Sequence, residues 1–156
     1  MREGAKFCVG ASSGGHMSEL AALLAFQDRW PLRPNLYIST LEISIDSLPA
    51  GARAYVIGEC DRRQPINAIR TLLRCFRIAY LERPQVVLTT GSLPLALFSL
   101  VCKIFGARII WIDSISQMER LSVSGRLIRP FADLFFVQWP ELVPHYRNVR
   151  YEGELV

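Results

Sequence analysis

The fold class is first indicated by a glycine-rich turn that separates an apolar run from a helical pattern. The run covers residues 6–11, the turn is Ser12-Ser13-Gly14-Gly15, and apolar residues then recur at helical spacing over residues 17–26. This order predicts a strand, a tight turn and a helix. Such units are typical of α/β folds, in which ligand loops lie at the carboxyl ends of parallel strands.

The same alternation continues along the chain. Further strands are predicted at residues 36–39, 54–58, 86–90, 108–112 and 134–137. A long helix is predicted to begin at Pro65 and to end at Pro84, with shorter helices at 94–105 and 124–131 and a loop at 114–122. Because 156 residues suffice for one hydrophobic core, we expect a single α/β domain over residues 1–156, Rossmann-like, with a mostly parallel sheet.

The composition excludes a disordered chain, because 51% of the residues are apolar and only 21% are charged. The net charge of +4 comes almost entirely from arginine, since Lys6 and Lys103 are the only lysines. Arginine favours phosphates and carboxylates, so an anionic partner is expected. The four cysteines have no metal-ligand spacing, so they are interpreted as reduced core thiols and no metal site is predicted.

Two segments bear on membrane contact. The longest apolar stretch, residues 93–107, is interrupted by Pro94, Ser99 and Lys103 and is shorter than the ~20 residues that cross a bilayer, so the chain is not expected to span one. In the long helix, one face carries Ile66, Ile69, Leu73, Phe76 and Tyr80, and another carries Arg63, Arg70, Arg74 and Arg77. The arginine row is interpreted either as a solvated face or as a contact with anionic lipid headgroups.

The loop from Gly10 to His16 partly matches several motifs. A P-loop requires a lysine after its last glycine, where this chain has His16. A short-chain dehydrogenase requires a lysine four places after a tyrosine, and none of the five tyrosines has one. The loop also fits a hydrolase nucleophile elbow with Ser12 as nucleophile, but the chain is short for a hydrolase sheet and offers only His145 as a downstream base.

The remaining interpretation is a turn that brings the backbone close to a diphosphate at a helix N-terminus. His16 would then lie at the cleft, where a neutral imidazole can accept a proton from an attacking sugar hydroxyl. The alternative is that His16 only caps its helix. The residues alone leave both interpretations open.

Four ordered motifs together resemble one family. They are Ser12-Ser13-Gly14-Gly15-His16, Thr90-Gly91-Ser92 with Pro94, Trp111-Ile112-Asp113-Ser114 with Arg120, and Ala132-Asp133 through Val137-Gln138-Trp139-Pro140-Glu141. The chain is similar over nearly its whole length to the membrane-recruiting, acceptor-side subunit of the split UDP-N-acetylglucosamine transferase of asparagine-linked glycosylation, and to bacterial exopolysaccharide counterparts of the PssD type. Asp113, where glutamate is more common in the family, and the lack of an N-terminal membrane anchor favour a bacterial-type relative.

The resemblance implies the N-terminal half of a GT-B glycosyltransferase that is active only with a catalytic, donor-binding subunit. The pair would move glucuronic acid or N-acetylglucosamine from a UDP-sugar to a polyprenyl-diphosphate-linked acceptor, in bacterial exopolysaccharide or glycan biosynthesis. We expect no cofactor, no nucleic-acid partner, and peripheral attachment to the membrane surface on the cytoplasmic face of the cell membrane. The alternative is a non-catalytic membrane adaptor that recruits and activates the catalytic subunit.

The resemblance also implies roles for individual residues, with His16 as the candidate general base. The candidate acceptor and diphosphate contacts are Ser13, Gly14, Gly15, Gly91, Ser92, Asp113, Ser114 and Arg120. Gly91 and Ser92 could instead only shape a turn, and Asp113 and Arg120 could form an ion pair that orders their loop. The candidate contacts with the partner subunit are Trp139, Pro140, Glu141 and the closing residues, with a core position as the alternative for Trp139.

Overall fold

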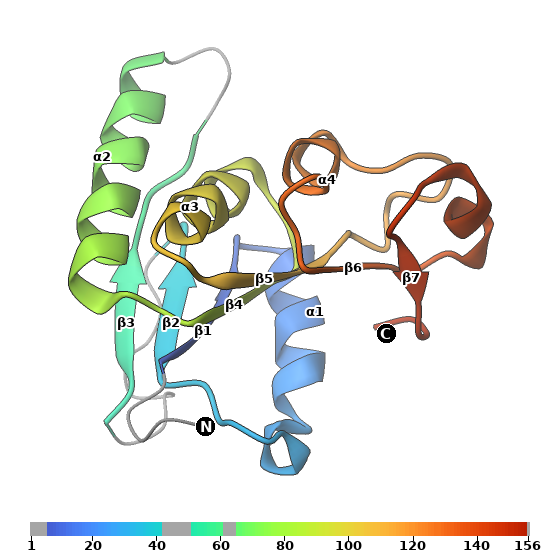
Figure 1. The fold of residues 1–156 in the computed structure, drawn as a ribbon, viewed down its shortest axis with the longest axis horizontal. Coiled ribbons are helices and arrows are strands. Elements are labelled where there is room, and N and C mark those ends of the chain that lie inside the picture. Colours follow the sequence, from blue (N-terminus) through green and yellow to red (C-terminus); the bar gives the residue numbers. More distant parts are fainter. Residues whose placement is uncertain (1–5, 42–50, 61–64, 156) are drawn as a thin grey trace.

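The computed structural model describes residues 6–41, 51–60 and 65–155 and shows one seven-stranded sheet flanked by helices (Figure 1). The strands are β1 (Phe7–Ala11), β2 (Leu36–Ser39), β3 (Arg53–Val56), β4 (Val86–Thr89), β5 (Arg108–Ile112), β6 (Leu134–Val137) and β7 (Arg150–Tyr151). Neighbouring strands are parallel throughout, in the order β3-β2-β1-β4-β5-β6-β7. The α/β, Rossmann-like prediction is confirmed, and β7 is a strand that the sequence pattern did not predict.

Helices cover the two faces of the sheet unequally. They are α1 (Gly15–Leu24), α2 (Pro65–Glu82), α3 (Leu93–Ile104) and α4 (Val123–Ile128), with short 3-10 turns η1 (Gln27–Arg29) and η3 (Pro140–His145). α2, α3 and α4 pack on one face, where Phe98, Trp111 and Phe135 are almost fully buried, while α1 lies on the other (Figure 1). There Leu20 of α1 joins a smaller cluster with Val9 and Leu88. The larger core therefore lies on the α2–α4 side.

The strand order reverses direction at β1, which lies between β2 and β4. From β1 the chain moves outward through β2 to β3, and then returns to continue on the other side of β1 with β4. In open parallel sheets, ligands bind outside the carboxyl ends of the strands at such a reversal. The loops that follow β1 and β4 therefore mark the expected place of a functional site.

α2 packs through a face that the sequence pattern did not indicate. Its buried residues are Thr71, Cys75, Ile78, Ala79 and Glu82. The row of large apolar side chains is on the outside instead, with exposed fractions of 59% for Ile69, 64% for Leu73, 40% for Phe76 and 60% for Tyr80. Arg63 and the side chain of Ile66 lie outside the described residues. Among the described helices, none is long and apolar enough to cross a bilayer.

The buried carboxylate of Glu82 joins the end of α2 to two other segments. Lys6 Nζ donates a 2.6 Å hydrogen bond to one oxygen, and Tyr55 Oη and Arg53 Nη1 donate to the other at 2.6 and 2.9 Å. Burial alone would raise the pKa of Glu82, but these three donors lower it from 4.5 to about 2. Glu82 is therefore charged at neutral pH and stabilises the contact of α2 with β3 and with the segment before β1.

Replacing Glu82 by glutamine is expected to lower the free energy of unfolding by about 3 kcal/mol near neutral pH, because the charge-assisted bonds are lost. The folded-state pKa of Glu82 lies below the unfolded value, so this stabilisation is present above pH 4.5 and is lost as the pH falls toward 2. Urea unfolding near pH 7 and near pH 3 measures the effect. The difference between wild type and Glu82→Gln should shrink at the lower pH.

Glu119→Gln is a matched control, because Glu119 is exposed. It should leave the unfolding midpoint unchanged at both pH values. If Glu82→Gln cost the same at both pH values, the charge of Glu82 would not be the source of the stabilisation.

Candidate active site

The loops that follow β1 and β4 meet at His16. His16 is the second residue of α1, and Gly14 precedes the helix with φ of +79°, a conformation that favours glycine. A Cβ atom on Gly91 would lie 2.7 Å from Cε1 of His16, so a larger residue there would displace the imidazole. The hydroxyl of Thr90 donates a 2.7 Å hydrogen bond to the His16 carbonyl oxygen. The structure thus brings together His16 and Gly91, two of the predicted site residues.

Glu19 lies one helical turn after His16 and is only 4% exposed. Its Oε1 accepts hydrogen bonds from the Ile115 N–H at 2.9 Å, the Gln138 amide at 3.2 Å and the Ser114 hydroxyl at 3.3 Å. Its Oε2 lies 3.5 Å from Nδ1 of His16, and neither of these two buried atoms has a hydrogen-bond partner among the described residues. Glu19 and His16 therefore form a carboxylate–imidazole pair. The hydrogen bonds to Oε1 fix the Glu19 carboxylate, and Oε2 is left facing the imidazole.

Burial alone would raise the pKa of Glu19, but the neighbouring His16 and the donors Ile115 and Gln138 lower it below its usual value of 4.5. Glu19 is therefore a carboxylate at neutral pH. A negative charge next to Nδ1 favours a proton on that nitrogen, which leaves Nε2 free to accept another. The imidazole is 25% exposed, so a substrate group can reach it.

Two clefts lie at these loops, and only the first is lined by the His16–Glu19 pair. One, of about 440 Å³, is lined by His16 and Glu19 together with Gly15 and Ser114. The other, of about 470 Å³, includes Ser92, whose φ of +85° is strained for a residue with a side chain and whose buried hydroxyl has no partner among the described residues. Of the predicted acceptor contacts, Gly15 and Ser114 therefore line the first cleft and Ser92 lines the second.

Ser13 is exposed and belongs to neither cleft lining. Its hydroxyl donates a 3.4 Å hydrogen bond to Glu59, and its N–H donates to the Thr40 hydroxyl at 3.4 Å. Ser12, the nucleophile of the hydrolase interpretation, lines the second cleft. Neither serine contacts His16 or His145 in the hydrogen bonds of the described residues, so no serine–histidine pair is present there.

Asp113 is not at the cleft, contrary to prediction. It is 1% exposed, and its carboxylate accepts hydrogen bonds from the Ser122 hydroxyl at 2.6 Å, the Ser122 N–H at 2.8 Å and the Trp111 indole at 3.2 Å. Ser122 in turn caps α4 by accepting from the Gly125 N–H at 2.7 Å. The expectation that the Asp113 side chain contacts the acceptor is wrong, because its buried carboxylate holds the start of α4.

The alternative, an ion pair between Asp113 and Arg120 that orders their loop, is not formed either. Arg120 is exposed and forms no salt bridge with Asp113 or with any other residue of the described segments.

Trp139 is half-buried, and its indole N–H donates a 2.6 Å hydrogen bond to the Ile115 carbonyl, so it supports the loop beside Glu19. Pro140 and Glu141 are exposed at the start of η3 and are accessible to a partner.

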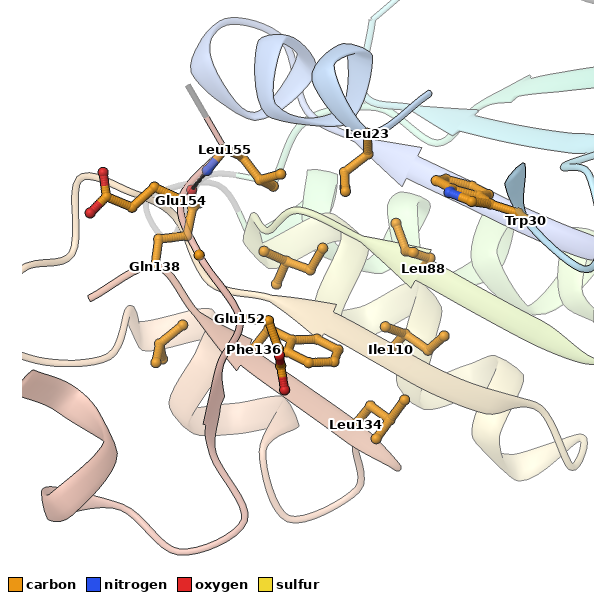
Figure 2. A pocket seen from close by; sticks show the side chains of 13 residues that line it. Leu23, Trp30, Leu88, Ile110, Leu134, Phe136, Gln138, Glu152, Glu154 and Leu155 are labelled. Atoms are coloured by element: carbon orange, nitrogen blue, oxygen red, sulfur yellow. Dashed lines mark hydrogen bonds between the residues drawn. The ribbon is translucent and has the colours of Figure 1, made fainter. Parts of the chain in front are cut away.

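An apolar groove of about 370 Å³ lies on the α1 side of the sheet (Figure 2). Leu88, Ile110 and Phe136 enter it from β4, β5 and β6, and Leu155 of the closing segment lies across from them. The Leu155 N–H donates a 2.8 Å hydrogen bond to Oε1 of Gln138, which places this segment along the groove. α1 thus leaves part of its sheet face without a covering helix.

The geometry can be compared with known proteins. A family model described as "Oligosaccharide biosynthesis protein Alg14 like" matches residues 7–155. The chain belongs to the Alg14 family. The Debaryomyces hansenii protein named UDP-N-acetylglucosamine transferase subunit ALG14 is 31% identical over 180 residues, which cover 98% of this chain and 77% of that protein. The human protein of the same name is 26% identical over 183 residues, which cover 99% of this chain and 85% of that protein.

Solved structures share the fold of this Alg14 chain. MurG of Acinetobacter baumannii superposes with a TM-score of 0.69 at 12% identity, over 94% of this chain and 45% of MurG. The UDP-GlcNAc 2-epimerase of Methanocaldococcus jannaschii, in complex with UDP-GlcNAc and UDP, superposes with a TM-score of 0.70 at 12% identity, over 96% of this chain and 46% of the epimerase. The chain therefore spans less than half of either protein, and its fold is that of one Rossmann-like half of a GT-B structure.

Two members of the site were not predicted from the sequence of this Alg14 protein. Glu19 follows His16 by three positions, a spacing that places both side chains on one face of a helix, and this signal could have found it. Gln138 donates to Glu19 from 119 positions away, and no local pattern indicates that contact. Within the described segments, no group of His, Cys, Asp and Glu side chains has the arrangement of a metal site.

Asp113→Asn is expected to lower the free energy of unfolding by about 2 kcal/mol, because an amide cannot accept all three hydrogen bonds and leaves a buried donor unpaired. Urea unfolding measures this loss. Asp28→Asn is the control, since the Asp28 side chain is 77% exposed, and it should change little. An Asp113→Asn protein of unchanged stability would contradict the structural role given to Asp113.

Proposed function

We propose that this chain is the acceptor-side subunit of a two-subunit glycosyltransferase, and that it contributes His16 as the general base. The observation that carries the proposal is the His16–Glu19 pair, which lies at the chain reversal of the sheet and opens into a cleft. Family membership supports the reaction class, because the Alg14 relatives are named as subunits of UDP-N-acetylglucosamine transferase. The donor-binding half would be a separate polypeptide.

In the proposed reaction, a hydroxyl of the acceptor sugar attacks the anomeric carbon of the UDP-sugar. A bond forms between the hydroxyl oxygen and that carbon while the bond from the carbon to UDP breaks, and UDP leaves with the electron pair. The hydroxyl proton moves to Nε2 of His16. Glu19 next to Nδ1 stabilises the imidazolium that results, so it acts as a positioning residue rather than as a substrate contact.

We place the diphosphate of a lipid-linked acceptor at the turn before α1. Gly14 and Gly15 present backbone without side chains there, and nothing lies within 4 Å of a Cβ added at either position. The first N–H groups of a helix lack intrahelical partners and favour an anion. Gly91, Ser92 and Ser114 are the proposed further contacts.

N-acetylglucosamine is the sugar favoured for transfer, because the Alg14 relatives carry it in their names. Glucuronic acid transfer to a polyprenyl diphosphate acceptor of bacterial exopolysaccharide synthesis is the second candidate. Parallel assays with UDP-N-acetylglucosamine and UDP-glucuronic acid separate the two.

We further propose that the complex is peripheral at the cytoplasmic face of the membrane. Exposed Pro140 and Glu141, and the closing segment along the apolar groove, are the proposed contacts with the donor-binding subunit.

His16→Ala is expected to reduce sugar transfer by the reconstituted complex by ~10²- to 10⁴-fold, the usual contribution of a general base. Complex formation, measured by co-purification, should not change. His145→Ala is the matched control, because His145 is exposed and lies in η3 away from the cleft lining. Full transfer by the His16→Ala complex would instead support a non-catalytic adaptor.

Glu19→Gln is expected to lower kcat about tenfold or more while leaving KM for the acceptor nearly unchanged, because the imidazolium loses its neighbouring charge. Glutamine keeps an oxygen for the Ile115 N–H, so the loop remains supported. Initial rates at varied acceptor concentration measure the split, with Glu119→Gln as control. A rise in KM at constant kcat would contradict the positioning role and make Glu19 a binding residue.

A further inference from the structure

The outer surface of α2 carries apolar side chains and arginines and is covered by nothing in the described structure. We define the α2 outer surface as Ile69, Leu72, Leu73, Phe76 and Tyr80, flanked by Arg70 and Arg77. We propose that this surface is a membrane-docking site, which lies flat on a bilayer containing anionic lipids. The proposal deepens the proposed function, on which it rests for the lipid nature of the acceptor.

The apolar part of this surface is unusual for a soluble helix. Leu73 is 64% exposed and Tyr80 60%, and both stand on a helix that already buries a different face on the sheet and on α3. The apolar row continues beyond α2. The ring centroids of Tyr80 and Phe105 lie 6.2 Å apart, and Ile104, which precedes Phe105, is 72% exposed. Contiguous apolar surface of this kind marks an interaction site. In Figure 1, α2 stands at the outer edge of the molecule.

The charges on the same helix select the partner. Arg70, Arg74 and Arg77 are exposed, and none forms a salt bridge with a described residue. The only acidic residue of α2 within the described side chains is Glu82, which is buried and bonded to Lys6 and Arg53. A helix surface with apolar and basic side chains and no exposed acid is complementary to a headgroup layer that is negative outside and apolar beneath.

The row geometry fits a flat surface. Arg70 lies one turn from Leu73, and Arg77 lies one turn from Leu73 and from Tyr80, so the aliphatic stems of these two arginines can lie beside the apolar row while their guanidinium groups reach phosphates. α2 has 18 residues, so it is about 27 Å long, and its outer surface runs along most of that length. The apolar groove of Figure 2 is on the opposite face of the sheet, so a membrane and a protein partner can be bound at the same time.

Flotation of the full-length chain with vesicles tests the proposal. Vesicles of phosphatidylcholine with phosphatidylglycerol should bind the chain, vesicles of phosphatidylcholine alone should bind it more weakly, and added salt should reduce binding to the anionic vesicles. Arg70→Ala and Arg77→Ala should each weaken binding to the anionic vesicles about fivefold. Leu73→Glu with Phe76→Glu should reduce binding to both kinds of vesicle by tenfold or more.

Phe26→Glu is the matched control, because Phe26 is 56% exposed but follows α1 on the other face of the sheet. It should bind vesicles as wild type does. All the variants change exposed positions, so their thermal unfolding midpoints should match that of wild type, which shows that they fold.

Two results would overturn the proposal. One is equal vesicle binding by wild type and by the Leu73→Glu, Phe76→Glu variant. The other is a wild-type chain that does not bind vesicles but forms a dimer that this variant dissolves, which would make the surface an interface between two copies. Transfer to a detergent-solubilised acceptor separates this proposal from the catalytic one, because the α2 variants should retain it whereas His16→Ala should not.

Discussion

The buried carboxylate of Glu19 joins the three segments from which the candidate active site is built. It receives hydrogen bonds from the loop after β5 and from Gln138 at the end of β6, while it stands on α1 beside His16. A buried charge is costly unless it is paired and hydrogen-bonded. Donors from distant segments compensate the desolvation of the Glu19 carboxylate. The His16 imidazole therefore lies beside a negative charge whose position is fixed.

Around this carboxylate, the order of the strands determines which loops can meet. Because β1 and β4 are neighbours at the reversal of the sheet, the loop that carries His16 lies against the loop that carries Gly91. Gln138 extends the same network to the closing segment through Leu155. The cleft and the apolar groove share the lining residue Leu155, which Gln138 holds by its hydrogen bond. A partner that displaced the closing segment would act on the residues that hold Glu19.

The fold could be predicted because strands and helices alternate with clear punctuation, and parallel βαβ units allow few arrangements. His16 could be predicted because its turn is local in sequence. The function of Asp113 could not, since a carboxylate after a strand looks the same whether it faces a cleft or caps α4. The buried face of α2 could not be predicted either. Periodicity marks the helix face with the largest apolar side chains, which here includes Leu73 and Tyr80. The face that packs on α3 and the sheet instead carries small residues such as Cys75 and Ala79, so Leu73 and Tyr80 remain exposed.

The proposed function requires that this chain supply part of an active site that is complete only with a second subunit. The most direct measurement is transfer of label from UDP-N-acetylglucosamine into lipid extract by this chain alone, by the donor-binding subunit alone, and by both together. Labelled lipid is expected only when both are present, because neither half alone holds donor and acceptor against each other. Equal transfer by the donor-binding subunit alone would contradict it.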